Sequence, residues 1–260
     1  MALTGPVAGR DRPLAHQRAF FTAMRGRYAD GYAISTGFLQ RVRDAVSPFV
    51  RGDTLDIGNG GLLGLDPRRA DTVTIADLCP DALRDVKEVA DGRVVSVGPD
   101  LARRLRGIGA NVLSLPFAPA SFDVVVMGYV AHHLSEASRA TSRDNVAHAL
   151  AEVRRVLRPG GSFVMIENCP TRVCKLTYEL AYPLAYRLML RLGKPLPYFL
   201  SATQIEAALA AAQLRVTHRQ GIAWDARVHQ PLFPRWAPPG WLWERLLPNQ
   251  LFVAQPSRSS

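Results

Sequence analysis

LDIGNGGLLGLD (residues 55–66) is the stretch that decides the fold of this chain. An apolar run ends at Asp56 and is followed by glycines at positions 58, 60, 61 and 64. Because glycine has no Cβ, such a cluster directly after a buried strand marks a loop whose backbone a ligand can approach closely. The loop lacks the G-x-G-x-x-G spacing of a dinucleotide-binding helix, and Pro67 follows soon after it. A long phosphate-binding helix is therefore not expected here.

Short β-rich runs alternate with helical stretches on both sides of this loop. Strands that are apolar throughout and alternate with helices are typical of a parallel sheet covered on both faces. The sequence therefore predicts an α/β doubly wound fold. The strands are expected at 53–57, 72–77, 108–113, 122–128, 161–167, 214–219 and 249–254, and the helices at 80–90, 142–157 and 202–212.

The remaining segments are expected to surround this sheet. Residues 13–46 read as two helices broken near Asp30-Gly31, which gives an N-terminal helical cover at 1–47 before a domain at 48–260. The segment 174–199 reads as an amphipathic helix inserted after the fifth strand, and a substrate cover is expected at about 168–200. Residues 220–248 are expected to form a loop-rich cover. The path of residues 94–107 stays open.

The composition narrows the class of protein. The chain has 260 residues and a net charge of +10, and 29 of its 32 cationic residues are arginines scattered along the chain. A diffuse Arg-rich composition explains this charge better than a polyanion site, although an anionic substrate or a membrane surface stays an alternative. No apolar run reaches the length of a membrane span and no signal peptide is recognised, which favours a cytoplasmic protein. The three cysteines show no C-x-x-C pairing, so neither metal nor disulfide roles are expected.

Two carboxylates follow neighbouring strands of the predicted sheet. Asp56 stands at the end of the first strand, and Asp77 at the end of the second, 21 positions later. A carboxylate beside the glycine loop suits a cationic group, because it would repel a phosphate. A carboxylate at the second position can accept both hydroxyls of a ribose. Together they indicate a nucleoside that carries positive charge. Asp77 can also serve as a helix N-cap before Pro80, and the two roles are compatible.

Four motifs in order resemble the class I S-adenosylmethionine-dependent methyltransferases. They are LDIGNGG, VTIADLCPDAL, NVLSLPFAPASFDVVVMGYVAHHL and EVRRVLRPGGSFVMIE, and they extend over residues 53 to 167. The resemblance implies a seven-stranded, mostly parallel sheet whose last strand, here 249–254, is antiparallel. It implies S-adenosyl-L-methionine as the cofactor, held by Asp56, Gly58, Asn59, Gly60, Asp77, Leu78, Asn111 and Val112.

The chain departs from the family pattern at two places. Leu62 replaces the usual third glycine of the loop, and Asn111 stands where an acid is common. Asn111 can still accept from the adenine amino group, and its alternative role is that of a turn residue.

Three side chains are candidates for a general base in methyl transfer. His132 and His133 come just after the fourth strand, and Glu167 ends the fifth. A hydroxyl or enol acceptor benefits from such a base, whereas an amine needs little beyond deprotonation. Because related methyltransferases often carry a His-His pair here, at least one histidine is expected to have a packing or helix-start role.

The acceptor is expected to contact aromatic residues around the cofactor domain. Tyr178 and Tyr182 lie four residues apart on the predicted helix after the fifth strand, and Tyr28 and Tyr32 on the N-terminal helices. Packing against the sheet edge is the alternative for each tyrosine. The sequence thus predicts a hydrophobic or aromatic small-molecule acceptor of specialised metabolism. We expect methylation at oxygen rather than at carbon or nitrogen.

The sequence leaves three alternatives to this hypothesis. A nucleic-acid methyltransferase is disfavoured because Met127-Gly128-Tyr129 replaces the Asn/Asp-Pro-Pro-aromatic box used on base amino groups. A nicotinamide-dependent oxidoreductase would require the G-x-G-x-x-G loop. A binding protein without catalysis stays an alternative because of Leu62. The sequence does not determine the oligomeric state.

Overall fold

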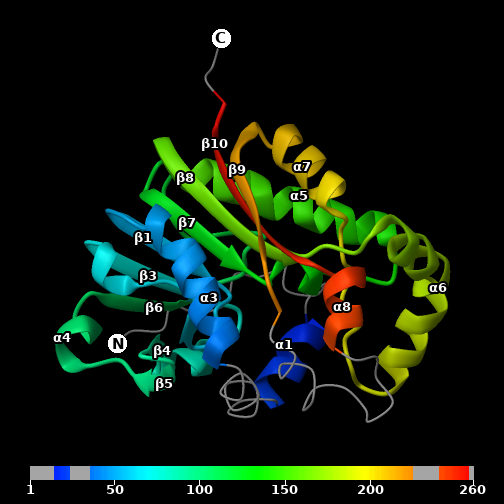
Figure 1. Ribbon diagram of the computed structural model, residues 1–260, viewed down its shortest axis with the longest axis horizontal. Helices are drawn as coiled ribbons and strands as arrows, with labels where there is room; N and C mark the ends of the chain where they lie inside the picture. Colours follow the sequence, from blue (N-terminus) through cyan, green and yellow to red (C-terminus); the bar gives the residue numbers. More distant parts are fainter. Residues whose placement is uncertain (1–14, 24–35, 225–239, 258–260) are drawn as a thin grey trace.

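The computed structural model describes residues 15–23, 36–224 and 240–257. Its centre is a seven-stranded sheet with the strand order β6-β3-β1-β7-β8-β10-β9 (Figure 1). β10 runs antiparallel to both of its neighbours, whereas the other pairs are parallel, which confirms the predicted fold class. The strands are β1 (Asp53–Ile57), β3 (Thr72–Asp77), β6 (Leu105–Gly109), β7 (Phe122–Gly128), β8 (Leu157–Asn168), β9 (Leu214–Ile222) and β10 (Asn249–Pro256).

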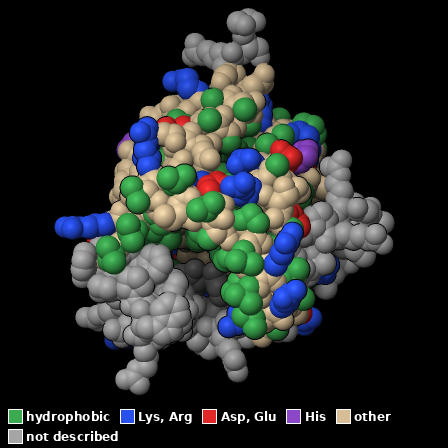
Figure 2. All heavy atoms as spheres, turned by 90° about the vertical axis from the view of Figure 1, so that its right-hand side faces the viewer, with side chains coloured by type: hydrophobic (Ala, Val, Ile, Leu, Met, Phe, Trp, Pro, Cys, Tyr) green, Lys and Arg blue, Asp and Glu red, His purple; other side chains and the backbone are tan. Residues whose placement is uncertain are grey.

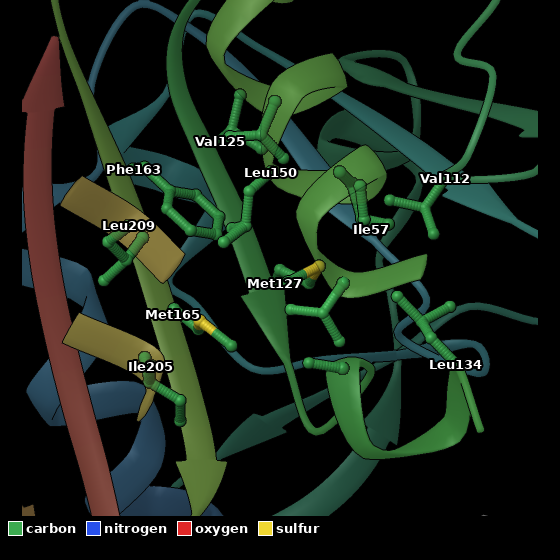
Figure 3. Packing of buried hydrophobic residues seen from close by; sticks show 14 of the residues in the cluster. Ile57, Val112, Val125, Met127, Leu134, Leu150, Phe163, Met165, Ile205 and Leu209 are labelled. Atoms are coloured by element: carbon green, nitrogen blue, oxygen red, sulfur yellow. The ribbon is translucent and has the colours of Figure 1, made fainter. Parts of the chain in front are cut away.

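Helices cover both faces of this sheet because successive side chains of each strand point to opposite sides. On β7, Val125 and Met127 face the cluster that includes α5 (Arg139–Val156) and α7 (Ala202–Ala211), as Figure 3 shows. Val124 and Val126 face the opposite cluster, in which α3 (Thr36–Val46) packs against the sheet. The central strands are thus buried on both faces, as their apolar sequences predict.

The N-terminal helices are described in part. α1 (Ala15–Ala23) and α3 lie within the predicted helical region, and the proposed break at Asp30-Gly31 lies outside the described residues. Phe38, Val42 and Val46 of α3 are buried against the sheet. α3 therefore belongs to the core of the fold, and the domain boundary at residue 47 stays a prediction. A 3₁₀ turn, η1 (Ser47–Phe49), connects α3 to the segment before β1.

The helix predicted at 80–90 is wrong. A short 3₁₀ turn, η3 (Pro80–Arg84), is followed by β4 (Lys87–Ala90) and β5 (Arg93–Ser96), which form a hairpin. Its turn is Asp91-Gly92, and both residues have positive φ angles, 49° and 68°. Asp-Gly between short β-rich runs is a strong sequence signal for such a hairpin, and it outweighs the helical pattern here. β2 (Leu62–Leu63) completes a separate three-stranded sheet.

A buried carboxylate anchors this small sheet. Glu88 on β4 accepts two hydrogen bonds from Arg68, at 2.6 and 2.8 Å, and one from Arg43 on α3 at 3.2 Å. These cations, Arg68 first, lower the pKa of Glu88 although its burial acts in the opposite direction. Arg68 follows the glycine loop in the 3₁₀ turn η2 (Pro67–Arg69), so the predicted absence of a long helix after the loop is confirmed.

The third strand of the parallel sheet begins and ends earlier than the predicted 108–113. β6 ends at Gly109, and the segment 94–107 reaches it through β5 and α4 (Pro99–Ala102). Asn111 leaves the strand direction because its Oδ1 accepts a hydrogen bond from the Leu113 amide at 3.0 Å. This side-chain turn competes with the strand ladder, which explains the shift.

Other boundaries differ less. The strands predicted at 53–57, 72–77 and 122–128 are confirmed, whereas β8 already begins at Leu157. Part of the stretch expected to be loop-rich forms regular elements: β9 continues to Ile222, and α8 (Gly240–Leu246) precedes β10. Among the described helices, none is long and apolar enough to cross a membrane.

The helix predicted after the fifth strand is α6 (Arg172–Arg191), which contains Pro183. Proline has no amide proton, so the carbonyl four residues earlier, that of Glu179, loses its helical donor. Arg139 at the start of α5 replaces that donor: its Nη1 donates to the Glu179 carbonyl at 3.0 Å and to the Glu179 carboxylate at 3.0 Å. The long helix thereby tolerates an internal proline and stays tied to α5.

Candidate functional site

A cavity of about 450 Å³ lies at the carboxyl ends of β1, β3 and β7. This is the edge at which doubly wound folds bind their ligands. All eight predicted cofactor residues line this cavity, so the structure brings them together as the sequence predicts. They are Asp56, Gly58, Asn59, Gly60, Asp77, Leu78, Asn111 and Val112.

Two glycines of the loop are required by contacts within the protein, before any ligand is considered. Gly58 has a φ of +69°, and a Cβ there would lie 2.5 Å from Cγ2 of Val130. Gly61 has a φ of +87°, and a Cβ there would lie 2.3 Å from the carbonyl oxygen of Ala82. Any side chain at either position would displace a neighbouring segment, so the glycines allow the loop to pack tightly while its backbone faces the cavity.

Two buried carboxylates fix the conformation of the loop. Asp77 accepts from the Gly60 amide at 3.0 Å and from the Cys79 amide at 2.7 Å, so it ties the loop to the turn after β3. Asp56 accepts from Nδ2 of Asn59 at 2.9 Å. The other end of that amide, Oδ1, accepts from the Gly61 amide at 2.9 Å. The Asn59 side chain is thus a brace within the loop.

Burial disfavours the ionised form of both carboxyl groups. The pKa of Asp56 is raised to about 7, mainly by its burial and further by the nearby Asp77, while the hydrogen bond from Asn59 acts in the opposite direction. Burial likewise raises the pKa of Asp77. Negative charge held in an apolar surrounding is stabilised by a cationic ligand group, so this end of the cavity favours a cation.

Asn111, which also lines the cavity, presents an amide donor. Its Oδ1 is engaged with Leu113, and its buried Nδ2 has no hydrogen-bond partner among the described residues. A buried amide without a partner is costly, and a ligand acceptor would satisfy it. The turn role of Asn111 is therefore present through Oδ1, and the group left to bind a ligand is the donor Nδ2, not the acceptor that the sequence predicts.

The three candidate base residues form one hydrogen-bonded chain. Oε2 of Glu167 lies 2.7 Å from Nδ1 of His132, and Nε2 of His132 lies 3.0 Å from Nε2 of His133. Oε1 of Glu167 accepts from the Ala131 amide at 2.7 Å, which fixes the carboxylate. The histidines belong to the 3₁₀ turn η4 (Ala131–His133) after β7, and Glu167 comes from the neighbouring β8. We call this chain the Glu-His-His relay.

Only the last member of the relay reaches the cavity. His133 lines it, whereas Glu167 and His132 are buried behind it. Nδ1 of His133 is buried and has no hydrogen-bond partner among the described residues, and the ring of Phe21 packs edge-on against it at 4.7 Å. Burial, and secondarily the neighbouring His132, lowers the pKa of His133 well below its usual value. His133 is therefore neutral at physiological pH and can act as a proton acceptor.

The predicted acceptor tyrosines are not placed at this cavity. Tyr182 is fully buried, and its hydroxyl donates to the Glu136 carbonyl at 2.9 Å. Tyr178 packs edge-on against it, with ring centroids 5.6 Å apart, and its hydroxyl donates to the Pro197 carbonyl. The alternative of core packing holds for these two residues. Tyr28 and Tyr32 lie outside the described residues.

Apolar residues from other elements line the cavity instead. Tyr129, directly after β7, has a positive φ of 58°, which is uncommon for a bulky residue and marks a constrained position beside the site. The spacing of apolar residues predicts that α1 and α3 each have an apolar face, but it does not show that this face lines a cavity. The apolar wall consists of Phe21, Phe38, Leu39, Val42, Tyr129, Val130 and Leu134.

Among the described residues, no cluster of three or more His, Cys, Asp or Glu side chains could hold a metal ion.

Residues 55–165 match the family model described as a methyltransferase domain. The uncharacterized methyltransferase YcgJ of Bacillus subtilis is 31% identical to this chain over 117 residues, which cover 44% of this chain and 40% of YcgJ. The ubiquinone/menaquinone biosynthesis C-methyltransferase UbiE of Paracoccus denitrificans is 27% identical over 171 residues, covering 62% of each protein. The chain thus spans less than two thirds of the length of these curated relatives.

The solved structures show the same fold. The 1,6-didemethyltoxoflavin-N1-methyltransferase of Burkholderia thailandensis, with bound 1,6-didemethyltoxoflavin and S-adenosylhomocysteine, superposes with a TM-score of 0.55 at 17% identity. The superposition covers 98% of this chain and 94% of that chain. Similarity at this level establishes the arrangement of the strands and helices.

Residues 55–165 therefore match a methyltransferase domain, and the sheet that contains them has the fold of class I, S-adenosylmethionine-dependent methyltransferases. The resemblance that the sequence motifs predict is confirmed. S-adenosyl-L-methionine is the cofactor of this class of domain, and the residues present fit it. Buried carboxylates line a cavity bordered by bare backbone, and Nδ2 of Asn111, which has no partner among the described residues, offers a donor to a heterocycle.

Proposed function

We propose that this protein transfers the methyl group of S-adenosylmethionine to an oxygen atom of a hydrophobic or aromatic small molecule in specialised metabolism. The observation that carries the proposal is the Glu-His-His relay, whose last member lines an apolar cavity next to two buried carboxylates. Such a relay suits an acceptor that must lose a proton as it is methylated.

Different residues of the cavity would hold different parts of the cofactor. Asp77 would accept hydrogen bonds from the ribose hydroxyls, with Leu78 and Val112 beside the adenine and Nδ2 of Asn111 donating to it. Asp56 would face the positively charged amino acid part. When bound, the cofactor supplies an electrophilic methyl group on a sulfonium. The task of the chain is to align the acceptor with that methyl at near-attack distance.

The relay would take up the acceptor's proton without leaving a charge on His133. The carboxylate of Glu167 requires a donor, so neutral His132 carries its proton on Nδ1, and its Nε2 accepts from Nε2–H of His133. Nδ1 of His133 is then the free base. As Nδ1 gains the acceptor's proton, Nε2 of the same ring passes its proton to Nε2 of His132. Positive charge thus forms on His132, beside the Glu167 carboxylate, where it is stabilised.

The nature of the cavity wall supports a hydrophobic acceptor. Aromatic and aliphatic side chains from α1, α3 and the loop after β7 line the cavity, and Phe21 among them packs against His133. An apolar ring or chain that binds against these side chains gains about 25 cal/mol for each Å² of apolar surface removed from water. A small molecule fits this arrangement better than a nucleic acid, which would need an extended basic groove.

Carbon methylation is the second candidate. The relative UbiE is a C-methyltransferase, and the same relay would draw a proton from a phenol or enol whose ring carbon is then methylated. The two candidates share the cofactor, the base and the class of acceptor. They differ only in which atom of the acceptor lies behind the methyl group.

A labelling experiment tests the proposed function. The purified protein is incubated with cofactor bearing an isotopically labelled methyl group and a set of phenols, matched aryl methyl ethers and arylamines, as well as cell extract. We expect labelled products from phenols, with the label at oxygen by NMR. Label at a ring carbon selects the second candidate. Label only in arylamines or in RNA, or no transfer to any acceptor, contradicts the proposal.

Cofactor binding is expected to depend on pH through Asp56. Because the pKa of this buried carboxyl is raised to about 7, a cationic ligand must first displace its proton below that pH. The affinity for S-adenosylhomocysteine, whose amino group is positive, should fall by up to about tenfold per pH unit below this value and level off above it. Calorimetry in two buffers of different ionisation enthalpy should detect the released proton.

The control for this prediction is a pair of variants. Asp56→Asn should flatten the pH dependence, whereas Asp100→Asn, at an exposed position on α4, should retain it. An affinity for S-adenosylhomocysteine that is flat across the neutral range in the unmodified protein would show that Asp56 does not face the cation.

A further inference from the structure

One side of α6 carries a row of exposed apolar side chains. Val173, Leu176, Leu180, Leu184 and Leu188 recur at three- and four-residue spacings, and Leu180 is 86% exposed. Residues at these spacings share one face of a helix. This face is opposite to the one that carries the buried Tyr182 and Tyr186, and we call it the outer face of α6. Soluble monomers rarely expose a contiguous apolar strip of this kind without a partner for it.

The charges next to this row all have the same sign. Among residues 172–200, Glu179 is the only acid, and it is half-buried and paired with Lys175 and Arg139. The exposed cations have no ion-pair partner among the described residues. Arg187 and Arg191 lie within the last turns of the helix, close to Leu184 and Leu188. Figure 2 shows hydrophobic and cationic side chains together over this side of the molecule. The exposed cations are Arg172, Arg187, Arg191 and Lys194.

We propose that the outer face of α6 docks onto an anionic membrane surface. A helix of 20 residues extends about 30 Å, and leucines flanked by arginine and lysine match the boundary between acyl chains and acidic headgroups. Charge decides between this partner and a second copy of the chain: two outer faces packed together would bring like charges into contact without any acid to compensate them. The same charges are attracted to acidic lipids.

The position of α6 connects this surface to the site. Its inner face packs against Tyr198, whose amide donates to the carbonyl of His132 at 2.8 Å, and Phe199 contacts the His132 ring at 5.0 Å between centroids. Docking through the outer face would hold the relay close to the bilayer. A lipid-soluble acceptor could then reach the cavity without crossing bulk water. The docking itself does not depend on the proposed reaction.

Vesicle co-sedimentation of the full chain, without cofactor or acceptor, tests the proposal. We expect binding to vesicles of phosphatidylcholine mixed with phosphatidylglycerol, weakening as salt increases, and little binding to phosphatidylcholine alone. The double variant Leu180→Glu/Leu184→Glu should abolish the binding. Arg187→Gln/Arg191→Gln should weaken it by about fivefold for each cation removed. The matched control, Arg103→Gln/Arg104→Gln, removes two exposed cations next to α4, on the opposite side of the molecule (Figure 1), and should bind more tightly than the α6 pair.

Two results would overturn the proposal. One is wild-type binding to the mixed vesicles by both α6 variants, with circular dichroism showing that they are folded. The other is a stable dimer in sedimentation that Leu180→Glu/Leu184→Glu converts to a monomer, which would identify the outer face as a self-association surface. Because no methyl transfer is measured, failure of the proposed reaction leaves these outcomes unaffected.

Discussion

Replacement of His133 by alanine is expected to lower the rate of acceptor methylation by about 10²- to 10⁴-fold, the usual contribution of a general base. His133 is the only member of the described relay that lines the cavity, and its Nδ1 is free of hydrogen bonds among the described residues. The affinity for S-adenosylhomocysteine should change little, because the two loop carboxylates stay in place. Steady-state kinetics and calorimetry separate the two effects.

The pH profile distinguishes a base from a packing residue. The pKa of His133 is lowered well below its usual value of about 6.5. With saturating cofactor, so that protonation of Asp56 does not limit binding, the unmodified enzyme should keep its rate down to that pH and lose it only as His133 becomes protonated. His133→Ala should lose this acid limb. His148→Ala, on the exposed side of α5, is the matched control and should retain both rate and profile.

Glu167→Gln tests the rest of the relay. It leaves the shape of the side chain but removes the charge that would stabilise protonated His132, so it should lower the rate while His133 stays in place. If His133→Ala, folded and able to bind cofactor, retains the rate and the profile of the unmodified enzyme, the histidines are structural and the proposed proton path is wrong.

Replacement of Asp77 by alanine is expected to weaken cofactor binding by about 1–3 kcal/mol, the range for losing charged hydrogen bonds. The variant would remove the proposed acceptor for the ribose and also release the Gly60 amide, so the glycine loop loses its tie to the turn after β3. Titration calorimetry with S-adenosylhomocysteine measures the change.

Two further variants separate binding from stability. Asp77→Asn keeps one carbonyl acceptor, so its loss of affinity should be smaller than that of Asp77→Ala. Asp100→Ala, at a fully exposed acid on α4, should leave the affinity unchanged. Thermal unfolding establishes that each variant is folded. Unaltered affinity in folded Asp77→Ala would remove this carboxylate from the cofactor site.

The cofactor side of the site could be predicted from the sequence because its signals are local. Asp56 and Asp77 end two apolar strands, and parallel strands bring their carboxyl ends to one edge of the sheet. The glycine loop lies between them, so its neighbourhood follows from the fold class. All eight residues predicted from these motifs accordingly line one cavity.

The acceptor side could not be predicted in the same way. Helical spacing shows that Tyr178 and Tyr182 share a face, but it does not show whether that face meets a cavity or the core. Phe21 and Phe38 reach the cavity from helices that precede the sheet in the chain. The hairpin at Asp91-Gly92 has a turn signal in the sequence, and this signal outweighs the helical pattern around it.

What the sequence by itself determined is the class of fold, the class of cofactor and the glycine loop that lines the cavity, because strand burial, glycine stereochemistry and acids at strand ends are properties of short segments. Only the tertiary structure decided that Glu167 lies against His132, that His133 alone of the three lines the cavity, and that α6 buries its tyrosines while exposing its leucines. Those relations depend on the register between β7 and β8 and on how the surrounding helices pack, and both are set by contacts between residues far apart in the chain.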